Sequence, residues 1–350
     1  MKIRIAEAAV QIKFLAILAK GPVESSPMAP STNSRRIGTA VTFAVWAVIV
    51  MAAGFAGSYM GYGGRRYALA LVVAAALFGF ELFLAVPDVL ARVESTLGSA
   101  APLAVLYPLA AVLGYCLLVA GNWKTALGGV AYVLAPVLLA GSSSRKSAGA
   151  WQDYAAAACL WLPIWARWMY WVFPYPPPLT HVLSILLALA TGVTAFVLMR
   201  RLDDTGYALE WRHGFGFNFG FNLLVFAAIA IPLGLKIHFI TYAPSIHRLQ
   251  PLVAIGILFF TAWPEEFLFR GILQNLLSRS FANEWTGLVV ASIIFGFSHI
   301  LHAPFPNWKY VLLASIAGFF YGRAWMKTKS LVPGVLIHAS VDILWHVLFR

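Results

Sequence analysis

The sequence predicts an all-α fold, a polytopic transmembrane helical bundle of about 8–11 spans. The first reason is composition: of the 350 residues, 61% are hydrophobic and only 11% are charged, and the mean hydropathy is +0.80. Soluble domains hold roughly 25% charged residues. The second reason is that the apolar residues gather in long stretches, and a helix of about 20 such residues crosses a bilayer. The short alternating segments of a membrane β-barrel do not occur.

The candidate spans follow one another along almost the whole chain. They are 39–62, 67–86, 101–121, 125–141, 152–173, 179–199, 217–235, 249–277, 286–301, 310–326 and 331–349. Three of these stretches, 125–141, 286–301 and 310–326, are short for a span, and they set the lower end of the predicted range.

Polar interruptions divide the chain into three predicted parts. Residues 1–36 are a basic N-terminal tail and linker, which begins with an amphipathic stretch resembling a surface helix or the start of a signal sequence. Residues 37–200 are an N-terminal transmembrane helical region of unknown role. The interruption at 200–216 carries several charges and precedes the third part, 215–350. This last part contains the charged residues on which the functional argument depends.

The formal net charge of +12 does not indicate a nucleic-acid partner, because the basic residues are scattered between the apolar stretches and form no clustered patch. If the chain has eleven spans, more of the basic residues lie on the same side of the membrane as the N-terminus. The positive-inside rule therefore predicts a cytoplasmic N-terminus. We expect a multi-pass protein of the bacterial inner membrane, surrounded by membrane lipid. Cys116 and Cys159 both lie in apolar stretches, and we interpret them as buried free thiols.

Charged residues interrupt two apolar stretches of the C-terminal part. Glu265, Glu266 and Arg270 lie within 249–277, and Asp342 lies near the end of the chain. A charged side chain at the centre of a bilayer costs at least about 2.5–3.5 kcal/mol and therefore usually marks function. Glu266 and Arg270 are at i and i+4, so they can pair on one helix face. Glu265 is rotated by about 100° from Glu266, and this pairing leaves it unexplained.

Two further pairs share the same i, i+4 spacing. Phe295 and His299 lie at the end of one stretch, and His338 and Asp342 lie in the last one. Taken singly, His299 is explained as a satisfied core residue, and His338 is explained by a hydrogen bond to Asp342 within its own helix. Pro264 removes a backbone N–H beside Glu265, and we expect it to kink the helix and open a polar cavity.

The three motifs in this order resemble the CPBP family, also called the Abi family. It comprises the CAAX prenyl endopeptidases and related bacteriocin-processing and immunity proteins. The motifs are Glu-Glu-x-x-x-Arg at 265–270, Phe-x-x-x-His at 295–299 and His-x-x-x-Asp at 338–342. The resemblance covers roughly 215–350 and does not extend to the N-terminal half. It implies an intramembrane protease domain in 215–350 that hydrolyses a peptide or a membrane-protein substrate without a covalent acyl-enzyme.

The resemblance also implies a role for each matching residue. Glu265 and His299 would bind and activate a water, and His338 and Asp342 would orient its partners or stabilise the oxyanion. Glu266 and Arg270 would hold the first helix in register, with Phe295 in support. The family pattern allows Asn or Asp at the last position, and an Asp cannot donate a hydrogen bond unless it is protonated.

The sequence leaves the need for a metal open. His299 and His338 with Glu265 or Asp342 could form a zinc site with one open position. No certain cofactor follows, and the missing His-Glu-x-x-His motif favours a metal-free mechanism. Signatures of other intramembrane proteases are absent from the sequence.

Two other functions compete with the protease interpretation. Intramembrane charges, with Glu81 as a further candidate, could serve a proton- or ion-coupled transporter. The missing inverted repeat argues against a transporter. A non-catalytic immunity or scaffold protein is the other alternative, which the presence of Glu265 and both histidines disfavours.

Overall fold

The structure is a computed structural model that describes residues 35–36, 38–143, 148–175, 177–212, 214–248 and 250–350. Arg35–Arg350 form one compact unit. The amphipathic stretch and the linker predicted in 1–33 lie outside the described residues. The predicted separation of 37–200 from 215–350 stays a prediction.

Eight helices of the described part are long and apolar enough to cross a membrane. They are α2 (Thr39–Tyr59), α3 (Gly64–Leu84), Pro87–Ala120, α6 (Trp123–Ser142), Pro178–Met199, α10 (Phe215–Lys236), Pro251–Ser280 and α16 (Leu331–Leu348). The predicted all-α, multi-pass membrane bundle is thereby confirmed, at the lower end of the expected number of spans.

Three of these helices change their winding along their length. Pro87–Ala120 consists of α4 (Pro87–Leu97), the 3₁₀ segment η1 (Gly98–Val105), α5 (Leu106–Tyr115) and the π-helical η2 (Cys116–Ala120). α9 (Pro177–Gly192) continues into the π-helical η3 (Val193–Met199). Pro251–Ser280 consists of α11 (Pro251–Ile257), η5 (Leu258–Ala262), α12 (Trp263–Glu266), η6 (Phe267–Gln274) and α13 (Asn275–Ser280), of which η5 and η6 are π-helical.

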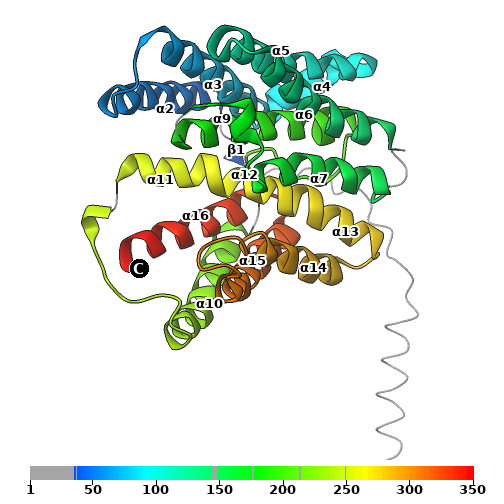
Figure 1. Ribbon diagram of the computed structural model, residues 1–350. Coiled ribbons are helices and arrows are strands. Elements are labelled where there is room, and N and C mark those ends of the chain that lie inside the picture. Colours follow the sequence, from blue (N-terminus) through cyan, green and yellow to red (C-terminus); the bar gives the residue numbers. More distant parts are fainter. Residues whose placement is uncertain (1–34, 37, 144–147, 176, 213, 249) are drawn as a thin grey trace, which may run out of the picture. The chain divides into compact units, whose positions relative to one another are not determined.

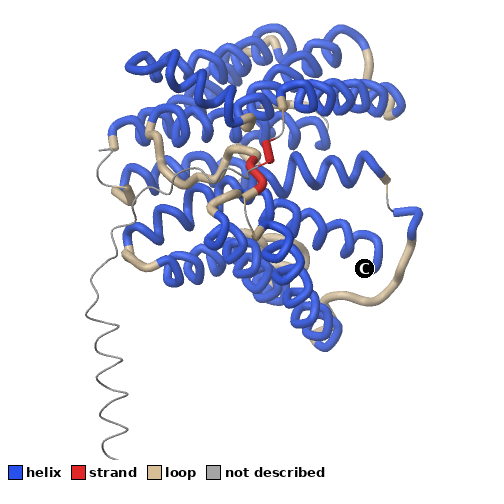
Figure 2. The backbone as a smooth tube through the Cα atoms, turned by 180° about the vertical axis from the view of Figure 1, so that it is seen from behind, coloured by secondary structure: helices blue, strands red, loops and turns tan. Residues whose placement is uncertain are grey.

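The remaining elements are shorter or more polar. They are α7 (Trp151–Trp165), α8 (Met169–Val172), the 3₁₀ turn η4 (Ile246–Arg248), α14 (Glu284–Phe297), α15 (Trp308–Thr328) and the antiparallel strand pair β1 (Arg35–Arg36) and β2 (Glu210–Trp211). The two strands lie side by side at the centre of Figure 2, which views the molecule from behind.

Three of the eleven expected spans are not among the eight. The stretch 152–173 is divided into α7 and α8, because Arg167 between them adopts a left-handed backbone conformation with φ of 61°. α14 has only 14 residues, although it is apolar. α15 has 21 residues but carries Lys309, Arg323 and Lys327.

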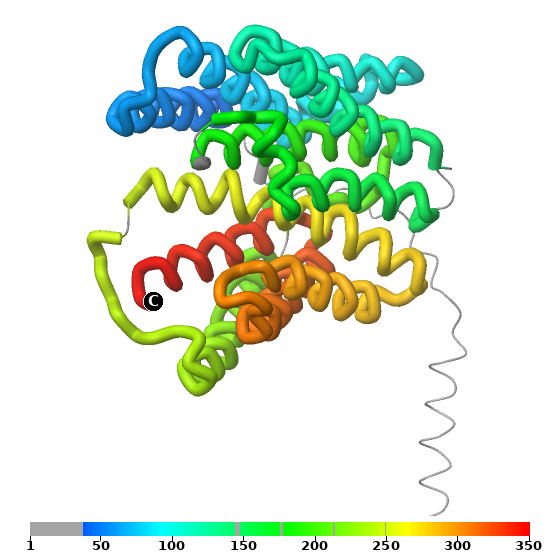
Figure 3. The backbone as a smooth tube through the Cα atoms, viewed as in Figure 1, coloured from blue at the N-terminus to red at the C-terminus, as the bar shows by residue number. Residues whose placement is uncertain are grey.

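The long helix Pro251–Ser280 lies between two groups of helices. In Figures 1 and 3 it is the yellow helix, with the N-terminal helices on one side and α10, α14, α15 and α16 on the other. Its π-helical segments contact α7 and α9 from the first group and α14 and α16 from the second. Glu265 and Glu266 are therefore placed at the junction of the N-terminal and C-terminal parts.

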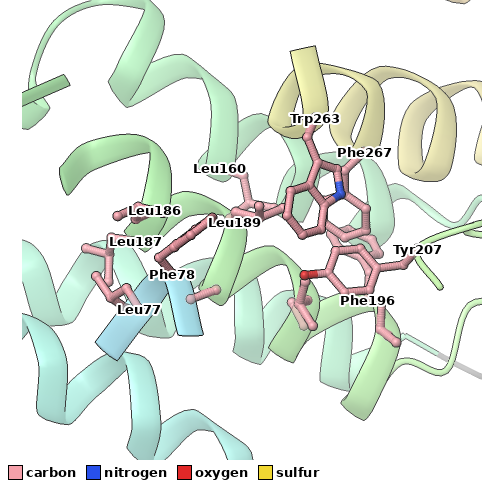
Figure 4. Close-up of a cluster of buried hydrophobic side chains, with 14 of the residues drawn as sticks. Leu77, Phe78, Leu160, Leu186, Leu187, Leu189, Phe196, Tyr207, Trp263 and Phe267 are labelled. Atoms are coloured by element: carbon pink, nitrogen blue, oxygen red, sulfur yellow. The ribbon is translucent and has the colours of Figure 1, made fainter. Parts of the chain in front are cut away.

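An aromatic cluster fixes this helix to the N-terminal helices (Figure 4). The Tyr207 ring stacks on Trp263 with centroids 5.8 Å apart and meets Phe267 edge-on at 5.1 Å. The Tyr207 hydroxyl donates a hydrogen bond of 2.7 Å to the backbone carbonyl of Glu81 in α3. Burial of these rings anchors one face of the helix in an apolar environment.

Two glycines allow α15 to approach the same helix from the other side. Gly318 and Gly322 are one turn apart, and a Cβ atom at Gly322 would collide with Gln274. Arg270 Nη2 donates to the Gly318 carbonyl and Gln274 Nε2 to the Gly322 carbonyl, each at 3.1 Å. This is the close contact between membrane helices that a small-xxx-small pattern permits.

We expect Gly322→Ala to lower the temperature of thermal unfolding in detergent. Overpacking at such a contact costs about 1–3 kcal/mol, which exceeds the helix-propensity gain of roughly 0.5–1 kcal/mol on replacing glycine. Gly220→Ala in α10 is the matched control, because a Cβ there meets no atom within 4 Å. An equal or higher unfolding temperature for Gly322→Ala would contradict the close-packing interpretation.

Candidate active site

Glu265 and Glu266 are adjacent on α12, but their side chains lie in different environments. The Glu266 side chain is fully buried, with 0% exposed, whereas 31% of the Glu265 side chain is exposed. The helical rotation of about 100° between neighbours predicts this separation. Pro264 does not end the helix, which runs without a break from Pro251 to Ser280. Instead the winding widens to π-helical turns on both sides of α12, a feature common at functional sites.

Glu266 holds two elements together through one oxygen. Its Oε1 lies 3.0 Å from Arg270 Nη1, as the i, i+4 spacing predicts, and 2.9 Å from His338 Nδ1 on α16. The Arg270 guanidinium is buried as well, and its central carbon lies 4.3 Å from the centre of the Phe295 ring on α14. The Glu266–Arg270–His338 clasp thus connects the central helix to both α14 and α16.

His338 also faces the two remaining site carboxylates. Its Nε2 lies 3.5 Å from Asp342 Oδ2 and 3.9 Å from Glu265 Oε2. A carboxylate only accepts hydrogen bonds, so the contact with Glu266 places a proton on His338 Nδ1. His338 therefore brings Glu265 and Asp342 together at Nε2. The predicted pairing of His338 with Asp342 is only one of its three carboxylate contacts.

His299 occupies the turn that follows α14. Its Nδ1 lies 2.9 Å from the Phe295 carbonyl oxygen and 3.0 Å from Ser298 Oγ. Since the carbonyl can only accept, Nδ1 carries the proton in the neutral ring and Nε2 is left as an acceptor. The backbone contact satisfies one nitrogen of the ring and leaves the other available for a water.

A cavity of about 100 Å³ joins the histidines. His299, His338 and Asp342 all line it. Glu265 is not among its lining residues and reaches the site through its contact with His338. The other lining residues are Leu223, Phe226, Ala227, Ala230, Ile231, Phe239, Ile240, Phe295, Tyr310, Leu313, Ala314, Ala317, Tyr321, Val341, Leu344, Trp345 and Phe349. The structure therefore gathers the residues of three distant motifs beside one largely apolar cavity.

Two cavity residues on α15, Tyr310 and Tyr321, escaped the sequence analysis. The Tyr310 ring lies 4.6 Å from the His299 ring, and the Tyr321 ring stacks on His338 at 4.7 Å with an interplanar angle of 19°. They lie three turns apart on the face that also carries Ala314 and Ala317. This helical periodicity was a usable signal, but tyrosines in an apolar stretch do not stand out as charges do.

The predicted metal ligands do not form a ligand set. Among the residues that the structure describes, no three His, Cys, Asp or Glu side chains are arranged to hold a metal ion. Of the candidates Glu265, His299, His338 and Asp342, His338 has a carboxylate at both ring nitrogens. Metal dependence stays open, and chelation tests it.

Comparison with known families supports the motif assignment. Residues 247–344 match the family model of the Rce1-like type II CAAX prenyl endopeptidases. The C-terminal part carries an Rce1-like domain. All three motifs lie inside the match, so the predicted resemblance to the CAAX protease family is confirmed. No curated protein and no solved structure shows a significant match to the chain.

The Glu266–Arg270–His338 clasp predicts different stabilities for variants of the two glutamates. We expect Glu266→Gln to reduce the yield and the unfolding temperature, because removing one partner of a buried ion pair costs about 3–5 kcal/mol. Glu265→Gln should unfold near the wild-type temperature, since its partly exposed carboxylate has no partner closer than 3.9 Å among the described side chains. The measurement is thermal unfolding of both purified variants in the same detergent. Equal losses of stability would contradict this division.

Proposed function

We propose that this chain is an intramembrane endopeptidase that hydrolyses a peptide bond with a water activated by Glu265 and His299. The Rce1-like match supports an intramembrane CAAX-type protease in general. The observation that carries the finer proposal is the contrast between the glutamates. Glu266 is buried and bound to Arg270 and His338 in the clasp. Glu265, by contrast, is partly exposed and lies beside His338 and Asp342.

The proposed reaction needs no covalent acyl-enzyme. A water held between Glu265 and His299 Nε2 gives a proton to the Glu265 carboxylate as its oxygen attacks the peptide carbonyl carbon. His338, protonated at Nε2 as well as at Nδ1, stabilises the oxyanion that forms, with Asp342 orienting the imidazole. The C–N bond then breaks, and the proton on Glu265 passes to the leaving nitrogen. Glu266 and Arg270 take no part beyond fixing the position of His338.

The cavity indicates the kind of substrate. Its walls are mainly aliphatic and aromatic side chains from α10, α15 and α16. Such walls suit apolar side chains of an extended peptide or of an unwound membrane-protein segment, and membrane lipid surrounds the bundle. We assign no nucleic-acid partner. We further propose a bacterial inner-membrane location with a cytoplasmic N-terminus.

A proton- or ion-coupled transporter is the competing function. Glu81 supports it in part, because both carboxylate oxygens are buried and make no hydrogen bond within the described part of the chain. Glu81 does not line the cavity beside the histidines, however. The cavity therefore does not connect Glu81 with the histidines as a proton relay would require. A non-catalytic scaffold is the other alternative, and absence of cleavage by the wild-type protein would favour it.

We expect Glu265→Gln to lower turnover by about 10²–10⁴ because the amide cannot act as a general base. The assay is cleavage of a peptide library by purified protein in detergent, where no ion gradient exists. Glu94→Gln in α4, a half-buried glutamate that does not line the cavity, is the control and should retain wild-type turnover. Gradient-driven solute uptake in proteoliposomes that Glu265→Gln abolishes, without peptide cleavage under any condition, would overturn the protease and favour the transporter.

Chelation tests the metal question separately. We expect 1,10-phenanthroline and EDTA to leave peptide cleavage unchanged, because the described side chains offer no three-residue ligand set. Cleavage rates before and after chelator treatment and dialysis are the measurement. Loss of activity that Zn²⁺ restores would contradict the metal-free mechanism and assign the histidines to a metal site.

A further inference from the structure

The site holds many hydrogen-bond acceptors and few donors. Glu265, Glu266 and Asp342 surround His338, and ionised carboxylates only accept. One imidazole nitrogen points at Glu266, and the other already lies 3.5 Å from Asp342. An oxyanion, by contrast, needs donors aimed at it. A side-chain amide at position 342 would have supplied one, and Asp342 does not.

Tyr310 is placed to supply a donor. It lies in the first turn of α15 and lines the cavity together with His299 and Asp342. Its ring packs against His299 at 4.6 Å, and its hydroxyl donates no hydrogen bond to any residue that the structure describes. The Tyr310 phenol is therefore a cavity side chain beside His299, and the cavity wall that it shares also includes Asp342.

Tyr321 differs, although it lines the same cavity. Its ring is stacked between His338, with centroids 4.7 Å apart, and Arg270, whose central carbon lies 5.3 Å from the ring centre. Packing on the clasp accounts for Tyr321. Tyr310 contacts His299 instead, and it is left as the candidate donor.

We propose that Tyr310 is a further catalytic residue, whose hydroxyl donates a hydrogen bond to the oxyanion formed during peptide hydrolysis. This inference rests on the proposed protease function. As the water oxygen bonds to the carbonyl carbon, one water proton moves to Glu265 and the negative charge develops on the carbonyl oxygen. Tyr310 keeps its proton and shares it with that oxygen. When the C–N bond breaks, the proton on Glu265 goes to the nitrogen, and Tyr310 is unchanged.

Kinetics of Tyr310→Phe test the proposal. Removing one oxyanion donor lowers kcat by about 10²–10³, and we expect this loss with a nearly unchanged KM because the donor acts in the transition state. The probe is an internally quenched peptide chosen from those that the wild-type full-length protein cleaves in detergent. Tyr321→Phe should lose less than Tyr310→Phe, and Tyr170→Phe, a surface hydroxyl on α8, should retain wild-type kinetics.

A second substitution separates catalysis from packing. Asp342→Asn adds an amide donor, so we expect the Tyr310→Phe/Asp342→Asn double variant to turn over at least about tenfold faster than Tyr310→Phe alone. A purely structural role of Tyr310 would give a lower unfolding temperature and no such rescue, and that result overturns the proposal. Wild-type kcat in Tyr310→Phe, while Glu265→Gln is inactive, overturns it too but leaves the protease function standing. Failure of the wild-type protein to cleave any peptide counts against both.

Discussion

The contact of one buried carboxylate, Glu266, with Arg270 and His338 is the constraint on which the rest of the site depends. A buried charge is tolerated only if it is paired, and losing one partner leaves the other uncompensated in an apolar environment. Glu266 and Arg270 are paired within the central helix, and His338 extends the pair to α16. Pairing these charges therefore brings together helices that are distant in sequence. It also fixes the orientation of the His338 imidazole ring towards Glu265 and Asp342.

The helix that carries the glutamates is held from two chemically different sides. Towards the N-terminal helices, Trp263 and Phe267 pack against Tyr207, and Gly192 in α9 lies so close to Phe267 that an added Cβ would be 3.0 Å from its ring. Towards α15, Arg270 and Gln274 are bound to backbone carbonyls. The helix Pro251–Ser280 is thus held by apolar packing on one side and by directional hydrogen bonds on the other. Together they position it more rigidly than either would alone. The N-terminal helices thus contribute to the placement of the site even though the family match does not reach them.

Local periodicity made much of this predictable. Hydropathy indicated a multi-pass helical bundle, and the i, i+4 rule separated the paired Glu266 from the unpaired Glu265, as their exposed fractions confirm. Long-range contacts were beyond these rules. The approach of His338 to Glu266 joins residues 72 positions apart, and no local pattern specifies it. The break at Arg167 was missed because hydropathy does not register a left-handed backbone residue.

Glu265 and Glu266 are the same residue type, and their environments suit the two different roles proposed for them. Both carboxylates lie near His338, but they meet different nitrogens of its ring, Glu266 at Nδ1 and Glu265 near Nε2. The contact at Nδ1 is short and buried, so it holds a proton on Nδ1 and fixes the orientation of the ring. The contact at Nε2 is longer, at 3.9 Å, and 31% of the Glu265 side chain is exposed, so water can compete for the Glu265 carboxylate. A catalytic group has to exchange partners during the reaction, whereas a structural group must keep one, and the distances are consistent with the catalytic role proposed for Glu265 and the structural role proposed for Glu266.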